Sequence, residues 1–193
     1  MTDCTTKQKI LKAACKLFDR KGADAVTMRR VATAVGITPM AIYRHFPNRD
    51  ALLKQISDDN FQTIAREMLA CRKQPDITSQ LVALAWPYFD YAFAHPHLFD
   101  YAFSVQRDDA RRFPEDFRAG KSPSFNVIVD AVAEGMRQGV LKKGDPYDVC
   151  MTINAHTHGL IALYRGGRFS FDEKQFRQFY LESMWRMFDG LKK

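Results

Sequence analysis

Residues 27–46 read TMRRVATAVGITPMAIYRHF, and their pattern predicts two short helices separated by a tight turn. Val31 and Val35 recur at helical spacing, and Gly36 can adopt the left-handed conformation that ends a helix. Thr38 is a favourable N-cap for a second helix. Two short helices in this order predict a helix-turn-helix, whose second helix lies in the major groove of DNA.

The two faces of the second predicted helix differ in character. Ile42 and Phe46 are four residues apart and share one apolar face, which we expect to be buried. A proline in the first turn is tolerated because the N–H it lacks would have no helical acceptor. The other face carries side chains that can contact DNA, namely Pro39, Met40, Tyr43 and Arg44. This face is the predicted reading surface.

Positive charge is concentrated in the same part of the chain. Residues 1–50 hold ten Lys or Arg and four Asp or Glu, whereas residues 51–193 hold nineteen and eighteen. Arg29 and Arg30 lie in a first helical turn, where the helix dipole favours acidic side chains instead. We interpret the excess as a phosphate-binding surface, because such a local basic segment is typical of DNA-binding domains.

Helical signals flank the motif on both sides. A capping box that begins at Thr5 and a terminating Gly22 bound an amphipathic first helix, and Asn48 can cap a fourth. The first three helices are expected to form a small bundle. We therefore predict a helix-turn-helix DNA-binding domain at residues 1–50 and a ligand-binding and dimerisation domain at residues 51–193.

The run from Ile10 to Leu53 resembles the TetR family of bacterial one-component repressors. The residues that carry the resemblance are Leu17, Phe18, Gly22, Thr27, Ala32, Gly36, Tyr43, His45 and Phe46. It implies a homeodomain-like three-helix bundle, a helical C-terminal domain, and a homodimer that binds double-stranded operator DNA.

The resemblance also implies roles for residues of the motif. It places four residues on the DNA backbone, namely Thr27, Tyr43, His45 and Arg49. Residues that read bases or position the second helix are then Arg29, Thr38, Pro39, Met40, Ala41 and Arg44, and Arg30 joins the set through its charge. Met40 departs from the small residue that is common at its position in the family, and Arg49 replaces the more usual Lys.

The rest of the chain predicts helices only, so the expected fold class is all-α. No alternation typical of strands competes with the helical spacing. The charged segment 104–123 predicts a loop with a short helical turn around Phe113 and Phe117. The expected helices are Ser79–Ala94 with a kink at Pro87, Pro96–Phe103, Ser124–Lys142, Pro146–Tyr164 and Asp172–Gly190.

The last two predicted helices carry more apolar residues than a surface helix needs. The uncharged run at 149–164 is shorter than the roughly twenty residues of a membrane span. In the TetR family the last two helices pair across a two-fold axis, so the resemblance implies a dimer interface, with an ordinary intramolecular core as the alternative. The candidate interface residues are Phe179, Met184, Trp185 and Phe188.

Eight aromatic residues fall between positions 86 and 103. A mostly apolar lining with few polar anchors is typical of a small-molecule pocket, although aromatic side chains at helical spacing also build ordinary cores. We expect an apolar effector that contains a ring or an acyl chain. The predicted lining residues are Trp86, Phe89, Tyr91, Phe93, Phe99, Phe103 and His156.

The sequence holds no signal for catalysis, a cofactor or a metal. The four cysteines lack CxxC spacing, and His156 and His158, two apart on a helix, point in different directions. The polar start of the chain does not resemble a signal peptide, so we expect a cytoplasmic protein. We predict no enzymatic activity, no cofactor and no metal site.

Together these features predict a ligand-responsive, homodimeric transcriptional repressor. It would bind a palindromic operator and leave it when a small apolar effector binds. Two alternatives stay open at this stage, a small all-helical enzyme and a redox-sensing or metal-sensing regulator.

Overall fold

The computed structural model describes residues 5–103 and 107–193, whose regular elements are helices apart from one isolated backbone bridge between Leu141 and Lys192. The all-α prediction is therefore confirmed. The chain forms two compact units, the described parts of Met1–Phe61 with Tyr91–Ala110, and of Gln62–Asp90 with Arg111–Lys193. None of the described helices is long and apolar enough to cross a membrane.

The first unit begins with the predicted capping box. Thr5 Oγ1 accepts a hydrogen bond from the Gln8 N–H at 3.3 Å, and Gln8 Oε1 accepts one from the Thr5 N–H at 2.9 Å. The helices of this unit are α1 (Thr6–Lys21), η1 (Ala23–Ala25, a 3-10 helix), α2 (Met28–Val35), α3 (Pro39–Tyr43), the start of α4 (Arg49–Ala70) and α6 (Pro96–Phe103).

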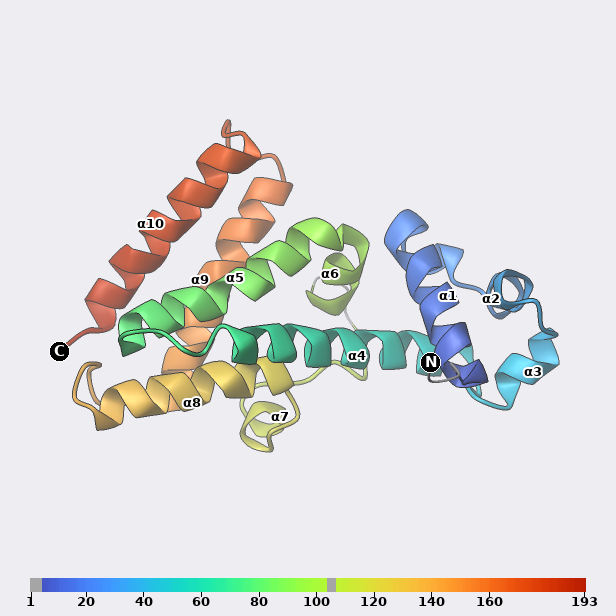
Figure 1. Ribbon diagram of the computed structural model, residues 1–193, viewed down its shortest axis with the longest axis horizontal. Coiled ribbons are helices and arrows are strands. Elements are labelled where there is room, and N and C mark those ends of the chain that lie inside the picture. The colour runs from blue at the N-terminus through green and yellow to red at the C-terminus, as the bar shows by residue number, and fades with distance from the viewer. Residues whose placement is uncertain (1–4, 104–106) are drawn as a thin grey trace. The chain divides into compact units, whose positions relative to one another are not determined.

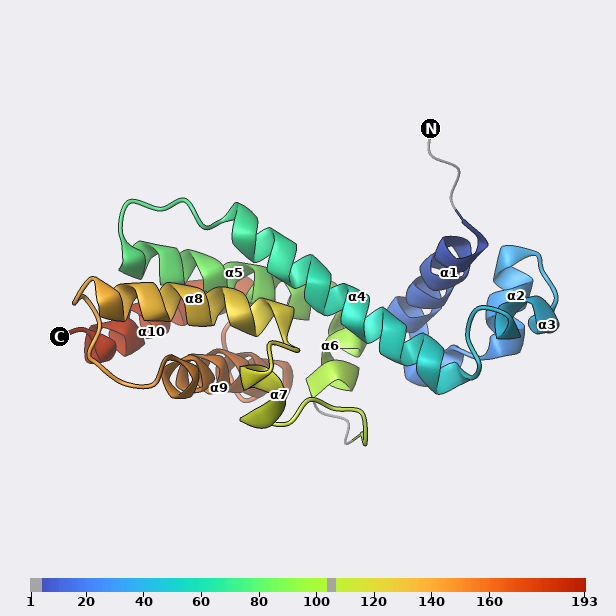
Figure 2. The ribbon, with the colours of Figure 1, turned by 90° about the horizontal axis from the view of Figure 1, so that it is seen from below.

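One apolar core joins α1, α2 and α3, which lie together in both ribbon views (Figures 1 and 2). Its side chains are at most 3% exposed, and they are Ile10, Ala14, Phe18, Val31, Ala32, Ile42 and Phe46. The Phe18 ring also meets the Tyr101 ring of α6 edge to face, with 5.2 Å between centroids. Burial of each large side chain contributes about 1.5–3 kcal/mol, so this core holds the small bundle together and against α6.

The second unit is a set of longer helices. They are the end of α4, α5 (Ile77–Ala94) as far as Asp90, α7 (Glu115–Arg118), α8 (Pro123–Arg137), α9 (Pro146–Arg165) and α10 (Glu173–Leu191), whereas the last turn of α5, from Tyr91, belongs to the first unit. α9 packs against both α8 and α10. Four rings connect α5 to α10, with 4.7 Å between the centroids of Phe89 and Tyr180. We call these four rings the aromatic cluster: Trp86, Phe89, Phe176 and Tyr180.

Most predicted helices differ from the observed ones by one or two residues at their ends. The exceptions are α3, which ends at Tyr43, and α8, which ends at Arg137 and not at Lys142. Gly139 has a φ of +75°, and the Val140 and Leu141 N–H groups both donate to the Gly135 carbonyl, so the chain turns away from the helix axis. The loop predicted at 104–123 contains the short α7, and its first three residues lie outside the described part.

Candidate nucleic-acid interface

Side-chain caps fix where α2 and α3 begin. Thr27 Oγ1 accepts a hydrogen bond from the Arg30 N–H at 3.2 Å, and Thr38 Oγ1 accepts one from the Ala41 N–H at 3.3 Å. Between the two helices Gly36 has a φ of +77°, the left-handed conformation expected for it. The threonines predicted from the sequence thus set the geometry of the turn.

The α3 helix presents a strongly two-faced surface. Ile42 is fully buried, whereas Met40 is 69% exposed and Tyr43 is 48% exposed. Pro39 is exposed as well, and Ala41 is half-buried. Two large, mostly apolar side chains are thus exposed on one short helix, and the contact of this face with DNA stays a prediction.

α3 is shorter than the sequence pattern suggested. It ends at Tyr43, and Arg44 and His45 lie just beyond it, both exposed. The chain continues as a turn, in which the His45 and Phe46 N–H groups both donate to the Ile42 carbonyl, and Pro47 disfavours a helical conformation at Phe46. Arg44 and His45 therefore flank the reading helix and do not belong to its regular part.

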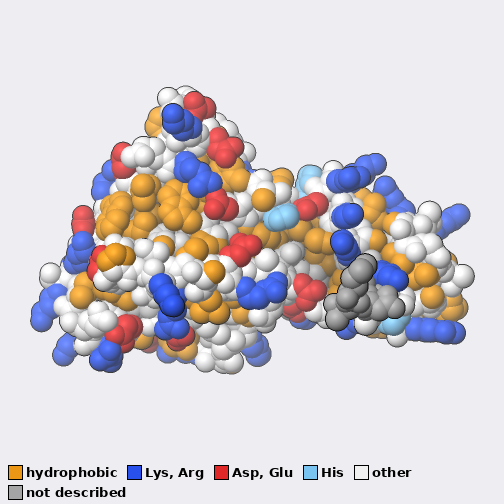
Figure 3. All heavy atoms as spheres, viewed as in Figure 1, with side chains coloured by type: hydrophobic (Ala, Val, Ile, Leu, Met, Phe, Trp, Pro, Cys, Tyr) orange, Lys and Arg blue, Asp and Glu red, His pale blue; other side chains and the backbone are white. Residues whose placement is uncertain are grey.

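The start of α2 combines two sources of positive potential. Arg29 and Arg30 are exposed in its first turn, and the unpaired N–H groups of any helix start carry partial positive charge. Figure 3 shows Lys and Arg side chains gathered over α1 to α3 on the face in view. A phosphate at this helix start would meet both the arginines and the helix dipole.

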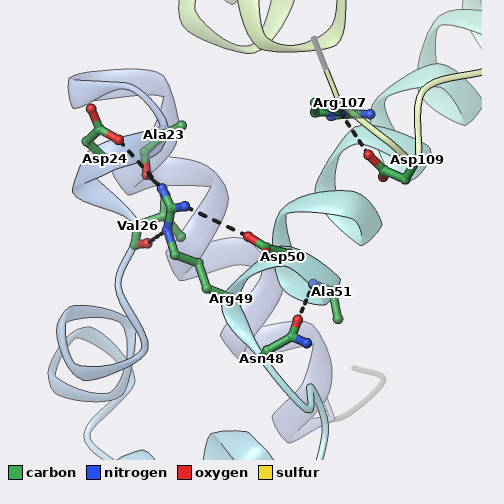
Figure 4. Close-up of polar contacts among 9 residues, drawn as sticks. All are labelled: Ala23, Asp24, Val26, Asn48, Arg49, Asp50, Ala51, Arg107 and Asp109. Carbon is green, nitrogen blue, oxygen red and sulfur yellow. Dashed lines mark hydrogen bonds and ion pairs between the residues drawn. The ribbon is translucent and has the colours of Figure 1, made fainter. Parts of the chain in front are cut away.

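Arg49 has a structural role that the sequence did not reveal. Its Nε donates to the Val26 carbonyl at 2.7 Å, and its Nη2 donates to the Ala23 carbonyl at 2.6 Å (Figure 4). The guanidinium also lies 3.8 Å from an Asp24 carboxylate oxygen and 4.0 Å from one of Asp50. Arg49 thus ties the start of α4 to the segment before α2, and its contact with phosphate stays a prediction.

The residues predicted to line an effector pocket belong to both units. Tyr91, Phe93, Phe99 and Phe103 lie in the first unit, where the Phe103 ring contacts those of Phe61 and Phe99. The second unit holds Trp86 and Phe89, in the aromatic cluster, and His156. A single site lined by all seven stays a prediction.

Of the polar groups on α5, α9 and α10 described next, the sequence analysis predicted only His156 as a lining residue. Tyr88 Oη lies 2.9 Å from His158 Nδ1, and His156 Nε2 lies 3.0 Å from Ser183 Oγ. The Tyr180 hydroxyl is buried without a hydrogen-bond partner among the described residues. Burial, reinforced by Asp90, raises the pKa of Tyr180 above its ordinary value, so the hydroxyl stays protonated and can donate.

Two of the four predicted interface residues do not face outward. Met184 is 1% exposed and Phe188 is fully buried within the single chain, so they have no surface to offer a second copy. The prediction that they lie at an interface is corrected, because both point into the core of the second unit. Trp185 is 37% exposed and Phe179 is half-buried, and these two keep the interface role as a prediction.

Two of the four cysteines, Cys15 and Cys150, have thiols that are poorly reactive. Burial raises the pKa of the Cys150 thiol, and burial with nearby Asp19 and Asp59 raises that of Cys15. Raised pKa values disfavour the reactive thiolate. Among the described residues no three His, Cys, Asp or Glu side chains come together to hold a metal ion. Cys4 lies outside the described residues.

The chain is similar in sequence and in fold to several known proteins. A curated relative is the nucleoid occlusion factor SlmA of Klebsiella pneumoniae, 25% identical over 177 residues that cover 89% of this chain and 85% of SlmA. The fold resembles a protein of unknown function from Rhodococcus sp. RHA1, with a TM-score of 0.83, 21% identity and coverage of 100% and 98% of the two chains. It also resembles the transcriptional regulator FadR of Bacillus subtilis in complex with stearoyl-CoA, with a TM-score of 0.75, 13% identity and coverage of 95% and 98%.

Two family profiles match the chain directly. Residues 10–56 match the N-terminal profile of bacterial regulatory proteins of the tetR family, and residues 81–186 match a tetracyclin repressor-like C-terminal domain. The second match alone spans more than half of the chain. With a capped helix-turn-helix, an exposed reading helix and a helical C-terminal region, the chain belongs to the TetR family of DNA-binding transcriptional regulators.

Proposed function

We propose that this regulator is a homodimeric repressor that binds a palindromic operator and releases it when an apolar effector binds. The observation that carries the DNA-binding part is the exposed face of α3, with Met40 and Tyr43 held in solvent above the buried Ile42. Two copies related by a two-fold axis would present two such faces to successive major grooves, about 34 Å apart.

The interface of the dimer is proposed on α9 and α10. Leu163 of α9 is 49% exposed and Trp185 of α10 is 37% exposed, although both are large and apolar. Figure 3 shows hydrophobic side chains gathered over α10 on the face in view. Exposed apolar patches of this kind are typical of interaction surfaces, and paired terminal helices are what the family resemblance implies.

The proposed effector is a small molecule with an acyl chain or a ring and one polar group. Trp86, Phe89 and Tyr180 would contact the apolar part, and the Tyr180 hydroxyl would donate a hydrogen bond to the polar part. A buried hydroxyl without a partner costs about 1–3 kcal/mol, which a ligand acceptor would recover. The stearoyl-CoA bound by the B. subtilis FadR makes an acyl thioester the first compound to test.

Effector and operator would act by shifting a conformational equilibrium. An effector that binds better to the arrangement unable to span two major grooves lowers the fraction that can bind DNA. The coupling is reciprocal, so operator DNA must weaken effector binding by the same factor, typically 5- to 150-fold. Calorimetric titrations of stearoyl-CoA with and without operator test this directly, and equal affinities would exclude it as an inducer.

The DNA-binding part is tested by selecting bound fragments from genomic DNA. The selected fragments should share a two-fold symmetric site, and Arg44→Ala should reduce the preference for that site over random duplex by about 1–3 kcal/mol. Arg168→Ala is the matched control, because Arg168 is exposed in the second unit. An unchanged preference in Arg44→Ala would remove its base-reading role, and an asymmetric site would contradict the dimer.

A further inference from the structure

A groove in the first unit runs between α1 and the last turn of α2 and has a volume of about 430 Å³. Its rim is formed by cationic side chains on one face of α1, and its floor is apolar. The rim carries Lys9, Lys12, Lys16 and Arg20, and Leu17 and Val35 are in the floor. None of the described residues that line the groove is acidic.

The four rim cations have no counterion among the residues that the structure describes. None of their side chains forms an ion pair or hydrogen bond with another residue in the ranges 5–103 and 107–193. Asp19, the one acidic residue within α1, is held by His95, with a carboxylate oxygen 2.9 Å from Nδ1. Like charges three and four residues apart destabilise a helix, so this row costs stability that an external anion would offset.

The row extends over more than one part of the unit. Two residues before the row begins, the Lys7 ammonium lies 5.5 Å from the centre of the Phe46 ring, close to the end of α3. Near the end of α1, Phe18 packs against Tyr101 of α6, and Asp19 bonds to His95, the residue before α6. From Lys9 to Arg20 the helix rises about 16 Å, so the anion that covers the whole row must be an extended one.

The apolar floor of the groove favours an acidic peptide over a sugar-phosphate backbone as the extended anion. Leu17 and Val35, with Ala13 and Ala34 beside them, offer apolar surface and no hydrogen bonds from their side chains. A sugar-phosphate backbone has no apolar side chains to place there, whereas a peptide does. The rim residues are all exposed, so a small molecule would stay largely in water, but about five extended residues of a peptide would span the row.

We propose that this groove binds an acidic peptide segment of a partner protein. Its carboxylates would pair with Lys9, Lys12, Lys16 and Arg20, and one or two apolar side chains between them would lie on Leu17 and Val35. Charge would supply attraction and speed of encounter, and the apolar contact would supply preference for the peptide over other anions. The groove thus gives the DNA-binding unit a second, protein-directed surface that does not depend on the effector.

The test is fluorescence anisotropy with a labelled twelve-residue peptide of Asp and Glu that has leucines at every fourth position. The full-length protein should bind it, and the K16E/R20E double variant should bind it at least tenfold more weakly. K73E/K174E is the matched control, because both lysines are exposed in the second unit and the charge change is the same. A peptide with serines in place of the leucines should bind at least threefold more weakly.

Each other result overturns the proposal. Equal weakening by both double variants would show attraction to net charge alone, and equal binding of the serine peptide would show that the floor is not used. Undetectable peptide binding would also overturn it. If K16E/R20E lowers operator affinity and reduces the salt slope by about two units, the cations neutralise DNA phosphates instead. Thermal unfolding of each variant shows whether it is folded, and A34D, at an exposed floor position, serves as the second variant if K16E/R20E is not.

Discussion

The reading helix α3 and the aromatic cluster both use large apolar side chains, but in opposite ways. In α3, Met40 is 69% exposed beside a fully buried Ile42. In the cluster, Phe89, Phe176 and Tyr180 are all fully buried. Packing within the chain accounts for the buried rings, whereas it does not account for the side chains that α3 exposes. Function is therefore easier to infer where a side chain is exposed at a cost than where burial already stabilises it.

The largest expected effect tests whether the aromatic cluster is a close-packed core. Phe176→Ala removes a buried ring that contacts Phe89, Tyr164 and Phe169, and should lower the free energy of unfolding by about 3–5 kcal/mol. Urea denaturation followed by circular dichroism measures it. Phe171→Ala, at a ring 37% exposed, is the control and should cost less. A loss below about 1 kcal/mol for Phe176→Ala would show that the Phe176 ring packs only loosely against these three neighbours.

The next effect separates structure from DNA contact at Arg49. Arg49→Ala removes two charge-assisted hydrogen bonds to backbone carbonyls, and for a side chain 36% exposed we expect a loss of about 1–2 kcal/mol in the free energy of unfolding. Arg49→Lys keeps the charge but cannot make both bonds, so its stability should also fall. Operator titrations at several salt concentrations then measure whether Arg49 contacts a DNA phosphate. Unchanged stability with a salt slope lower by about one unit would make Arg49 a phosphate contact only.

A smaller effect is expected when the N-cap residue of α3 or of α10 is replaced. Thr38→Ala removes the bond to the Ala41 N–H and should cost about 1 kcal/mol, and Asp172→Ala should cost a similar amount at the start of α10. Only the first should weaken operator binding beyond its effect on stability, because it loosens the reading helix. Thr38→Ser retains the hydroxyl and is the control. Equal DNA affinity for Thr38→Ala and Thr38→Ser would show that the cap does not position α3.

The smallest effect is a pH dependence in the second unit. Burial, with Arg186 nearby, lowers the pKa of His156 below its ordinary value, so the folded state takes up a proton less readily than the unfolded state. Stability should therefore be fully present above about pH 6.5 and fall as the pH drops below it. The melting temperature should decrease more in wild type than in His156→Gln. His45→Gln, at an exposed site in the first unit, should behave as wild type.

The sequence predicted the caps and the turn of the helix-turn-helix well because local signals decide them. The caps at Thr27 and Thr38 and the turn at Gly36 act within four residues, and the structure has all three. It missed the bonds from Arg49 to Ala23 and Val26, which span more than twenty residues. It also placed Met184 and Phe188 at an interface, because a wide apolar stripe looks the same whether it faces a neighbouring helix or a second subunit.

In and just after α3, the residues that hold the helix in place differ from those expected to contact DNA, so the two sets can evolve separately. Ile42 and Phe46 hold the helix in place, while Met40, Tyr43 and Arg44 contribute little to that packing. Mutations at the three exposed positions can therefore change which sequence is read without a threat to folding. A duplicated copy of the gene could acquire a new operator by a few such changes, with its core and the groove on α1 inherited intact.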